Sequence, residues 1–146
     1  MSLMNNIVNG LMGNLSELTP EKLTEDYGMY LMEGESIQTG FILMRDVVIF
    51  TDKRIIDIDK QGATGKKSRV SSIYLDSVIN VSAETAGFGL DDSELTIEYI
   101  SSPFFRSMGG TVTAMKKFEF PKKYQITNLY KLLQEIAYTN HLNINK

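Results

Sequence analysis

Between residues 35 and 120 the chain alternates apolar and polar side chains with a period of two. This is the spacing of antiparallel β-strands that bury one face, because successive side chains of a strand point to opposite sides. The clearest case is Leu95, Ile97 and Tyr99, which alternate with glutamate and threonine. Polar and glycine-containing turns separate the segments, and the pattern predicts strands at residues 35–43, 46–51, 54–60, 68–74, 78–85, 94–101 and 111–120.

Helical spacing replaces this alternation at both ends of the chain. After Pro121, apolar side chains recur every three or four residues up to Ala137, which predicts one amphipathic closing helix. Thr19 followed by Pro20 is a helix start signal, and an apolar face at residues 3–15 predicts a further helix. The predicted fold is mainly β with helices (α+β): seven antiparallel strands in a half-open barrel, capped by the C-terminal helix and preceded by short N-terminal helices.

Composition narrows the chemistry that such a fold can carry. The 146 residues fit one compact domain, and the chain has no cysteine and a single histidine, His141, expected on a solvated tail that begins at Asn140. This excludes thiol nucleophiles and sites with several histidine ligands. The net charge of −3 disfavours nucleic acid as a partner. Apolar runs are far shorter than a membrane span, so we expect a cytoplasmic protein. Because the sequence offers no catalytic set, we also expect no enzymatic activity, and we expect no cofactor or metal.

Two pairs of aspartates raise the question of a cation or acid–base site. Asp57 and Asp59 stand in a stretch similar to the start of a calcium loop, but Ser68 occupies the place of the bidentate glutamate. We therefore interpret Asp57 and Asp59 as the water-facing positions of a strand. Asp91 and Asp92 fit a turn before the next strand.

Four blocks of sequence carry a resemblance to a known family. They are RDVVIFTDKRII at residues 45–56, DKQGATGKK at 59–67, ETAG at 84–87 and DSEL at 92–95. In this order they resemble the bacterial pleckstrin-homology-like domains, an uncharacterised family of single-domain bacterial proteins. The resemblance covers roughly residues 31–138 and implies a pleckstrin-homology fold. Together with the helical spacing at the N-terminus and the polar C-terminal residues, it predicts an N-terminal helical segment (1–30), the pleckstrin-homology-like domain (31–140) and a flexible tail (141–146).

Basic side chains gather after the third predicted strand, at Lys66, Lys67 and Arg69, with Lys53 and Arg54 nearby in the sequence. Such a basic run either binds an anionic partner or keeps a sheet edge soluble, and the sequence leaves both interpretations open. The first strand–strand loop, where pleckstrin-homology domains gather the positive charge that binds phosphoinositides, holds a single arginine. Phosphoinositide binding is therefore disfavoured.

The family resemblance implies an assembly role rather than a reaction. We expect a non-catalytic protein-interaction module that forms a cyclic homo-oligomer, of about five protomers by resemblance, and presents a hydrophilic surface to another protein. The alternative is a peripheral membrane or anionic-ligand-binding adaptor with an apolar loop at Phe104 and Phe105. The candidate interaction surface comprises Arg69, Glu84, Thr85, Lys66 and Lys67.

Overall fold

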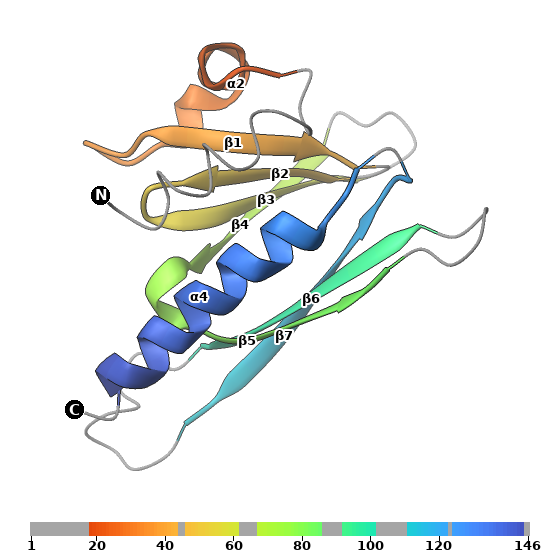
Figure 1. Cartoon of the computed structure of the whole chain (residues 1–146). Coiled ribbons are helices and arrows are strands. Elements are labelled where there is room, and N and C mark those ends of the chain that lie inside the picture. The colour runs from red at the N-terminus through yellow and green to blue at the C-terminus, as the bar shows by residue number, and fades with distance from the viewer. Residues whose placement is uncertain are drawn as a thin grey trace. The chain divides into compact units, whose positions relative to one another are not determined.

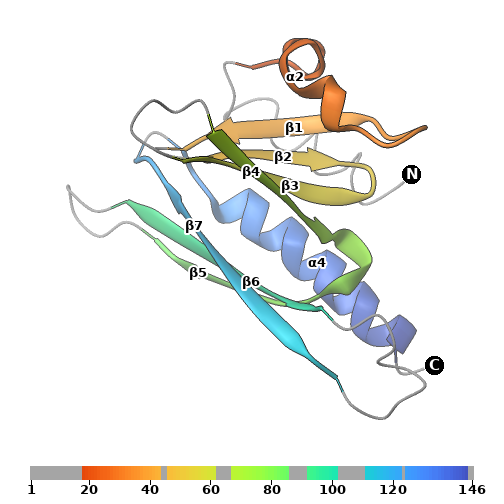
Figure 2. The same cartoon turned by 180° about the vertical axis from the view of Figure 1, so that it is seen from behind.

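The computed structural model describes residues 18–43, 46–61, 67–85, 92–101, 111–122 and 124–144. The chain divides into two compact units, Met1–Ile73 and Tyr74–Lys146, and each unit contains one antiparallel sheet (Figures 1 and 2). The seven predicted strands and the closing helix are confirmed, with bounds that differ from the predicted ones by a few residues. The helix predicted at residues 3–15 lies outside the described residues.

In the first unit, four strands form a sheet in the order β1-β2-β3-β4. The central strand β2 pairs antiparallel with both β1 and β3. A short helix and a 3₁₀ turn precede the sheet, and α2 lies next to β1 in Figure 1. The elements are α2 (Pro20–Tyr27), η1 (Gly28–Tyr30), β1 (Ile37–Ile42), β2 (Asp46–Thr51), β3 (Arg54–Gln61) and β4 (Lys67–Tyr74).

Helix α2 begins where the sequence predicts it. The Thr19 hydroxyl accepts a hydrogen bond from the Lys22 amide at 3.1 Å, and Pro20 occupies the first turn, where its missing N–H costs nothing. Leu23 points from α2 onto the sheet and is fully buried. A Cβ at Gly40 would lie 3.0 Å from the Leu23 Cδ1 atom and 3.2 Å from the Val48 carbonyl oxygen, so glycine permits this close approach.

Both faces of the central strands in this sheet are buried. On the opposite face to α2, the rings of Phe41 and Phe50 meet edge to face at 5.9 Å. The expectation that Asp57 faces water is wrong, because Asp57 is buried beside Val48 in the strand register. Every residue of β3 from Arg54 to Ile58 is buried, so alternation no longer separates an inner from an outer face. The core under α2 comprises Leu23, Ile37, Val47, Ile49, Ile56 and Ile58.

In the second unit, three strands form a sheet in the order β5-β6-β7. The predicted alternation in β6 is confirmed, since Leu95 and Ile97 are buried together with their cross-strand partners Phe118 and Val81. The closing helix packs along β5 and η2 through an apolar face of leucine and isoleucine. The elements are η2 (Leu75–Ser77), β5 (Val78–Glu84), β6 (Ser93–Ile100), β7 (Thr113–Phe120) and α4 (Thr127–Ile144).

Helix α4 continues beyond the point where a solvated tail was expected. Asn140 is buried, and its Nδ2 atom donates to the carbonyl oxygens of Leu75 and Val78, both at 2.8 Å. The predicted flexible tail at residues 141–146 therefore begins inside a helix that extends to Ile144. The expectation that Asn140 is solvated was wrong because its two carbonyl partners lie more than sixty positions earlier in the chain.

Candidate interaction surface

Four of the predicted surface residues are exposed near the ends of edge strands. Lys67 and Arg69 lie on β4, the last strand of the first sheet, and share one face of it because they are two positions apart. Glu84 ends β5, the first strand of the second sheet, and Thr85 follows it. The other predicted residues, Lys66, Phe104 and Phe105, lie outside the described residues.

Strand β4 is exposed on both of its faces over most of its length. Its first five residues, from Lys67 to Ser71, are all exposed, and they include the apolar Val70 at 36%. A strand that covers a core on one side would instead show alternate burial. Within the described part of the chain no strand follows β4 in its sheet, so its outer edge has backbone donors and acceptors available for another strand.

Arg54, which the sequence grouped with the surface lysines, is buried and paired. Its Nε and Nη2 atoms donate to the two carboxylate oxygens of Glu35 at 2.8 and 2.9 Å, a bidentate ion pair. The same guanidinium donates to the Ser72 hydroxyl at 2.7 Å and to the Tyr30 carbonyl at 2.6 Å. The inclusion of Arg54 in a basic surface is therefore wrong, because its guanidinium is buried and makes these four hydrogen bonds within the first unit.

The ionisation of Glu35 depends on this network. Burial alone would raise the pKa of the Glu35 carboxyl, but hydrogen bonds from Arg54, from the Thr51 hydroxyl and from the Met32 amide, with the positive charge of Arg54, lower its pKa to about 2. The described hydrogen-bond partners of Glu35, which are Met32, Thr51 and Arg54, all lie within the first unit. We therefore interpret the Glu35–Arg54 pair as a structural clamp that ties η1 to the first sheet.

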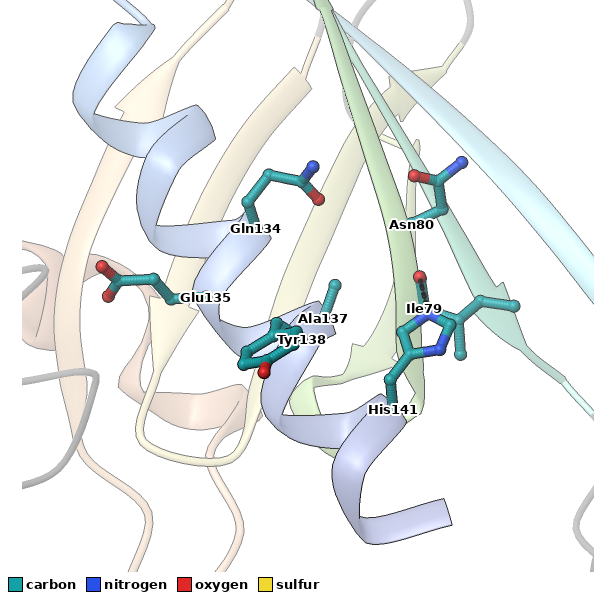
Figure 3. Close-up of a pocket in the computed structure, with 7 residues that line it drawn as sticks. All are labelled: Ile79, Asn80, Gln134, Glu135, Ala137, Tyr138 and His141. Atoms are coloured by element: carbon teal, nitrogen blue, oxygen red, sulfur yellow. Dashed lines mark hydrogen bonds between the residues drawn. The ribbon is translucent and has the colours of Figure 1, made fainter. Parts of the chain in front are cut away.

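A groove of about 450 Å³ lies between α4 and β5. Figure 3 shows Gln134 extending from α4 and Asn80 standing on β5 on either side of the gap. The register of β5 shifts at Ile79, a β-bulge, and the Nε2 atom of His141 lies 2.8 Å from the Ile79 carbonyl oxygen (Figure 3). Because a carbonyl only accepts, Nε2 carries the proton here. The lining residues are Ile79, Asn80, Gln134, Glu135, Ala137, Tyr138 and His141.

A row of glutamates crosses the polar face of the second sheet. Glu84 on β5, Glu94 on β6 and Glu119 on β7 are direct cross-strand partners, so their side chains share one face. The Lys117 Nζ atom lies 3.6 Å from a carboxylate oxygen of Glu94, the middle member of the row. The row ends at the outer edge of the sheet, on Glu84, which is exposed.

Sequence reasoning missed the groove, and of the glutamate row it identified only Glu84 as a candidate surface residue. Gln134 and Glu135 fit the outer face of an amphipathic helix, and His141 fits a free tail, so no local signal marked them.

In the described part of the chain, no group of three or more His, Cys, Asp or Glu side chains could hold a metal ion. None of the described helices is long and apolar enough to cross a membrane.

The order of elements, seven antiparallel strands followed by one long helix, is that of a pleckstrin-homology fold. Solved structures agree. A pleckstrin homology domain from Shewanella amazonensis SB2B has a TM-score of 0.62 and 32% identity, covering 89% of this chain and 97% of that one. A DUF1696 family protein with a pleckstrin-homology domain from Shewanella loihica PV-4 has a TM-score of 0.61 and 27% identity, covering 85% and 97%.

Family membership follows from the sequence as a whole. The family model described as "Bacterial PH domain" matches residues 6–137, and the chain belongs to this family. A curated relative, the uncharacterized protein YjqA of Bacillus subtilis (strain 168), is 40% identical over 130 residues, which span 89% of this chain and 97% of the relative. None of these names states a reaction. The predicted family and fold class are confirmed.

Proposed function

We propose that this protein is a non-catalytic assembly module that joins copies of itself through a strand edge and presents a polar surface to another protein. The observation that carries the proposal is β4, a terminal strand exposed on both faces along five successive residues. A strand in this state is a template for pairing with another chain. Main-chain hydrogen bonds supply the affinity, and Val70 adds apolar area at the contact.

Ring closure is the arrangement that best fits such an edge. Identical chains that join head to tail through two different edges form either a closed ring or an open filament, and in a ring every copy of the two joining edges is paired. The family resemblance suggests about five protomers. In this arrangement Lys67 and Arg69 flank the contact on β4, while Glu84 and Thr85 mark the end of β5 as polar surface.

The second candidate is a peripheral adaptor for membranes or other anionic ligands. It is supported by the two cations Lys67 and Arg69, exposed on one face of β4. It is weakened by the net charge of −3, which repels an anionic surface. Flotation with vesicles containing anionic lipid separates the candidates, because the adaptor binds in a salt-sensitive manner and the assembly module does not bind.

Light scattering coupled to size exclusion tests assembly at tens of micromolar. The wild-type chain is expected at several times its 16.5 kDa mass. Val70→Asp places a charge in the β4 contact and is expected to lower the mass to that of one chain. Val112→Asp is the matched control, since Val112 is also exposed but lies outside β4, and it is expected to keep the wild-type mass. A wild-type protein that is strictly monomeric contradicts the proposal.

A further inference from the structure

We propose that the groove between α4 and β5 binds an extended peptide segment of a partner protein, which adds as a fourth strand to the edge of β5. This goes beyond assembly through β4, and it rests on the proposed function only in taking the partner to be a protein. The two sites lie on different strands, β4 and β5, so each can be tested without the other.

The backbone of β5 is the first part of the site. It is the terminal strand of its sheet. At its start, the carbonyl oxygens of Val78 and Ile79 already form hydrogen bonds with the α4 side chains of Asn140 and His141. No strand among the described residues pairs with the outer edge from Asn80 to Glu84. This leaves a length of edge sufficient for a short added strand.

The groove provides the second part of the site. Its volume of about 450 Å³ is within the range of ligand pockets and exceeds the space that a single large side chain needs. Ile79, Ala137 and Tyr138 supply apolar lining, and Tyr138 is 66% exposed, so burying its ring is a source of affinity. We therefore expect one aromatic or large aliphatic side chain of the peptide to occupy the groove.

The negative charge of the glutamate row favours a basic residue on the face of the added strand that points away from the groove. The row Glu119–Glu94–Glu84 ends at the β5 edge, and the next position in this row belongs to the incoming strand. A lysine or arginine there gains from Glu84 and relieves like-charge repulsion, whereas an acidic residue is repelled. The described residues that line the groove include no lysine or arginine, which disfavours an anionic ligand such as a phosphorylated segment.

Strand geometry fixes the spacing of these two residues. In an antiparallel arrangement the peptide residue opposite Glu84 faces the row, and the residue opposite Val81, three positions later, faces the groove beside α4. The two peptide side chains point to opposite faces, so their spacing must be odd. The expected motif is a basic residue followed three positions later by an aromatic or large aliphatic one.

The test uses a set of fluorescein-labelled, threonine-rich synthetic decapeptides on the full chain. One position carries Lys, Glu or Thr, and the position three residues later carries Phe, Asp or Thr, in every combination. Fluorescence anisotropy is expected to show tightest binding for the Lys/Phe peptide. N-methylation of alternate backbone amides in this peptide is expected to abolish binding, because the added strand loses its donors.

Two surface variants tie binding to the proposed site. Glu84→Lys is expected to reverse the preference, so that the Glu/Phe peptide binds more tightly than the Lys/Phe peptide. Tyr138→Ala is expected to weaken the Phe peptides by about tenfold and to leave the Thr peptides unchanged. Glu119→Lys makes the same charge change at the far end of the row, two strands away, and is expected to change the preference much less.

The outcomes separate this inference from the assembly proposal. Equal binding of all peptides, or a Lys/Phe preference that survives both Glu84→Lys and Tyr138→Ala, overturns the peptide site. A drop in oligomeric mass caused by these two variants also overturns it, because a second copy of the chain would then occupy the groove. A monomeric protein that still binds the Lys/Phe peptide contradicts the assembly proposal alone.

Discussion

The two sheets treat their charged residues in opposite ways. In the first sheet, Glu35 and Arg54 are buried and paired, Thr51 donates a hydrogen bond to Glu35, and Arg54 also donates to the Ser72 hydroxyl and the Tyr30 carbonyl. In the second, glutamates stand side by side on the polar face, where Lys117 lies beside Glu94. A charge without a partner is too costly to bury, whereas exposed like charges cost little. The comparison therefore indicates a structural role for the first set and leaves the second set on the surface, where the proposed peptide site would use Glu84.

The largest expected effect comes from breaking the buried pair. Arg54→Met keeps most of the side-chain volume but leaves the Glu35 carboxylate buried without its partner, which is expected to destabilise the fold by about 3–5 kcal/mol. Urea denaturation followed by circular dichroism measures this loss. Adding Glu35→Leu to Arg54→Met removes the stranded charge and is expected to recover much of it. A loss below about 1 kcal/mol in Arg54→Met would show that the network is not a clamp.

A smaller effect is expected at the end of α4. Asn140→Ala leaves the carbonyl oxygens of Leu75 and Val78 without their donor, at a cost of about 1–3 kcal/mol in unfolding free energy. Asn143→Ala, on an exposed position of the same helix, is the matched control and is expected to change stability by less than about 0.5 kcal/mol. Equal effects of the two substitutions would mean that the contact between Asn140 and the residues before β5 contributes nothing.

The stability of the first sheet at acid pH tests the role of Glu35. The pKa of Glu35 is lowered to about 2 from an ordinary value of 4.5, so its ionisation stabilises the fold fully above pH 4.5. This stabilisation is expected to decline as the pH falls from 4.5 towards 2. The double variant Glu35→Leu with Arg54→Met lacks the group, and its unfolding free energy is expected to decline less over this range. Identical pH profiles would contradict the assignment.

The smallest effect is expected in the glutamate row, and it has the opposite sign. Glu84→Lys replaces a like-charge neighbour of Glu94 by an opposite charge, which is expected to stabilise the fold by about 0.2–1 kcal/mol. The same denaturation measurement detects it, with Ser82→Lys on the same face of β5 as a control for added positive charge. Destabilisation by Glu84→Lys alone would show that Glu84 has a structural role.

Local patterns predicted the strands but could not reveal what lies against them. The alternation of Leu95 and Ile97 predicted β6 because its outer face is in water. The same rule placed Asp57 in water and was wrong, since the rule has no information about a second buried face. The continuous apolar run at residues 47–50 was the available signal for a strand buried on both sides.

Contacts distant in sequence explain the remaining differences. Arg54 finds its carboxylate 19 positions earlier, and Asn140 finds its carbonyls more than sixty positions earlier. No spacing rule links such residues, so single-sequence reasoning interpreted both as solvent-exposed. Glu84 was identified through the family resemblance, but its place in the row with Glu94 and Glu119 depends on strand register, which only the structure provides.

Hydrogen exchange of β4 at low and high micromolar protein tests the central claim, that this edge joins copies of the chain, most directly. Backbone amides of residues 67–71 that point away from β3 have no strand partner among the described residues. We predict that these amides exchange rapidly in dilute protein and become protected as concentration rises, and that Val70→Asp removes this protection. Exchange rates that are the same at both concentrations would contradict it.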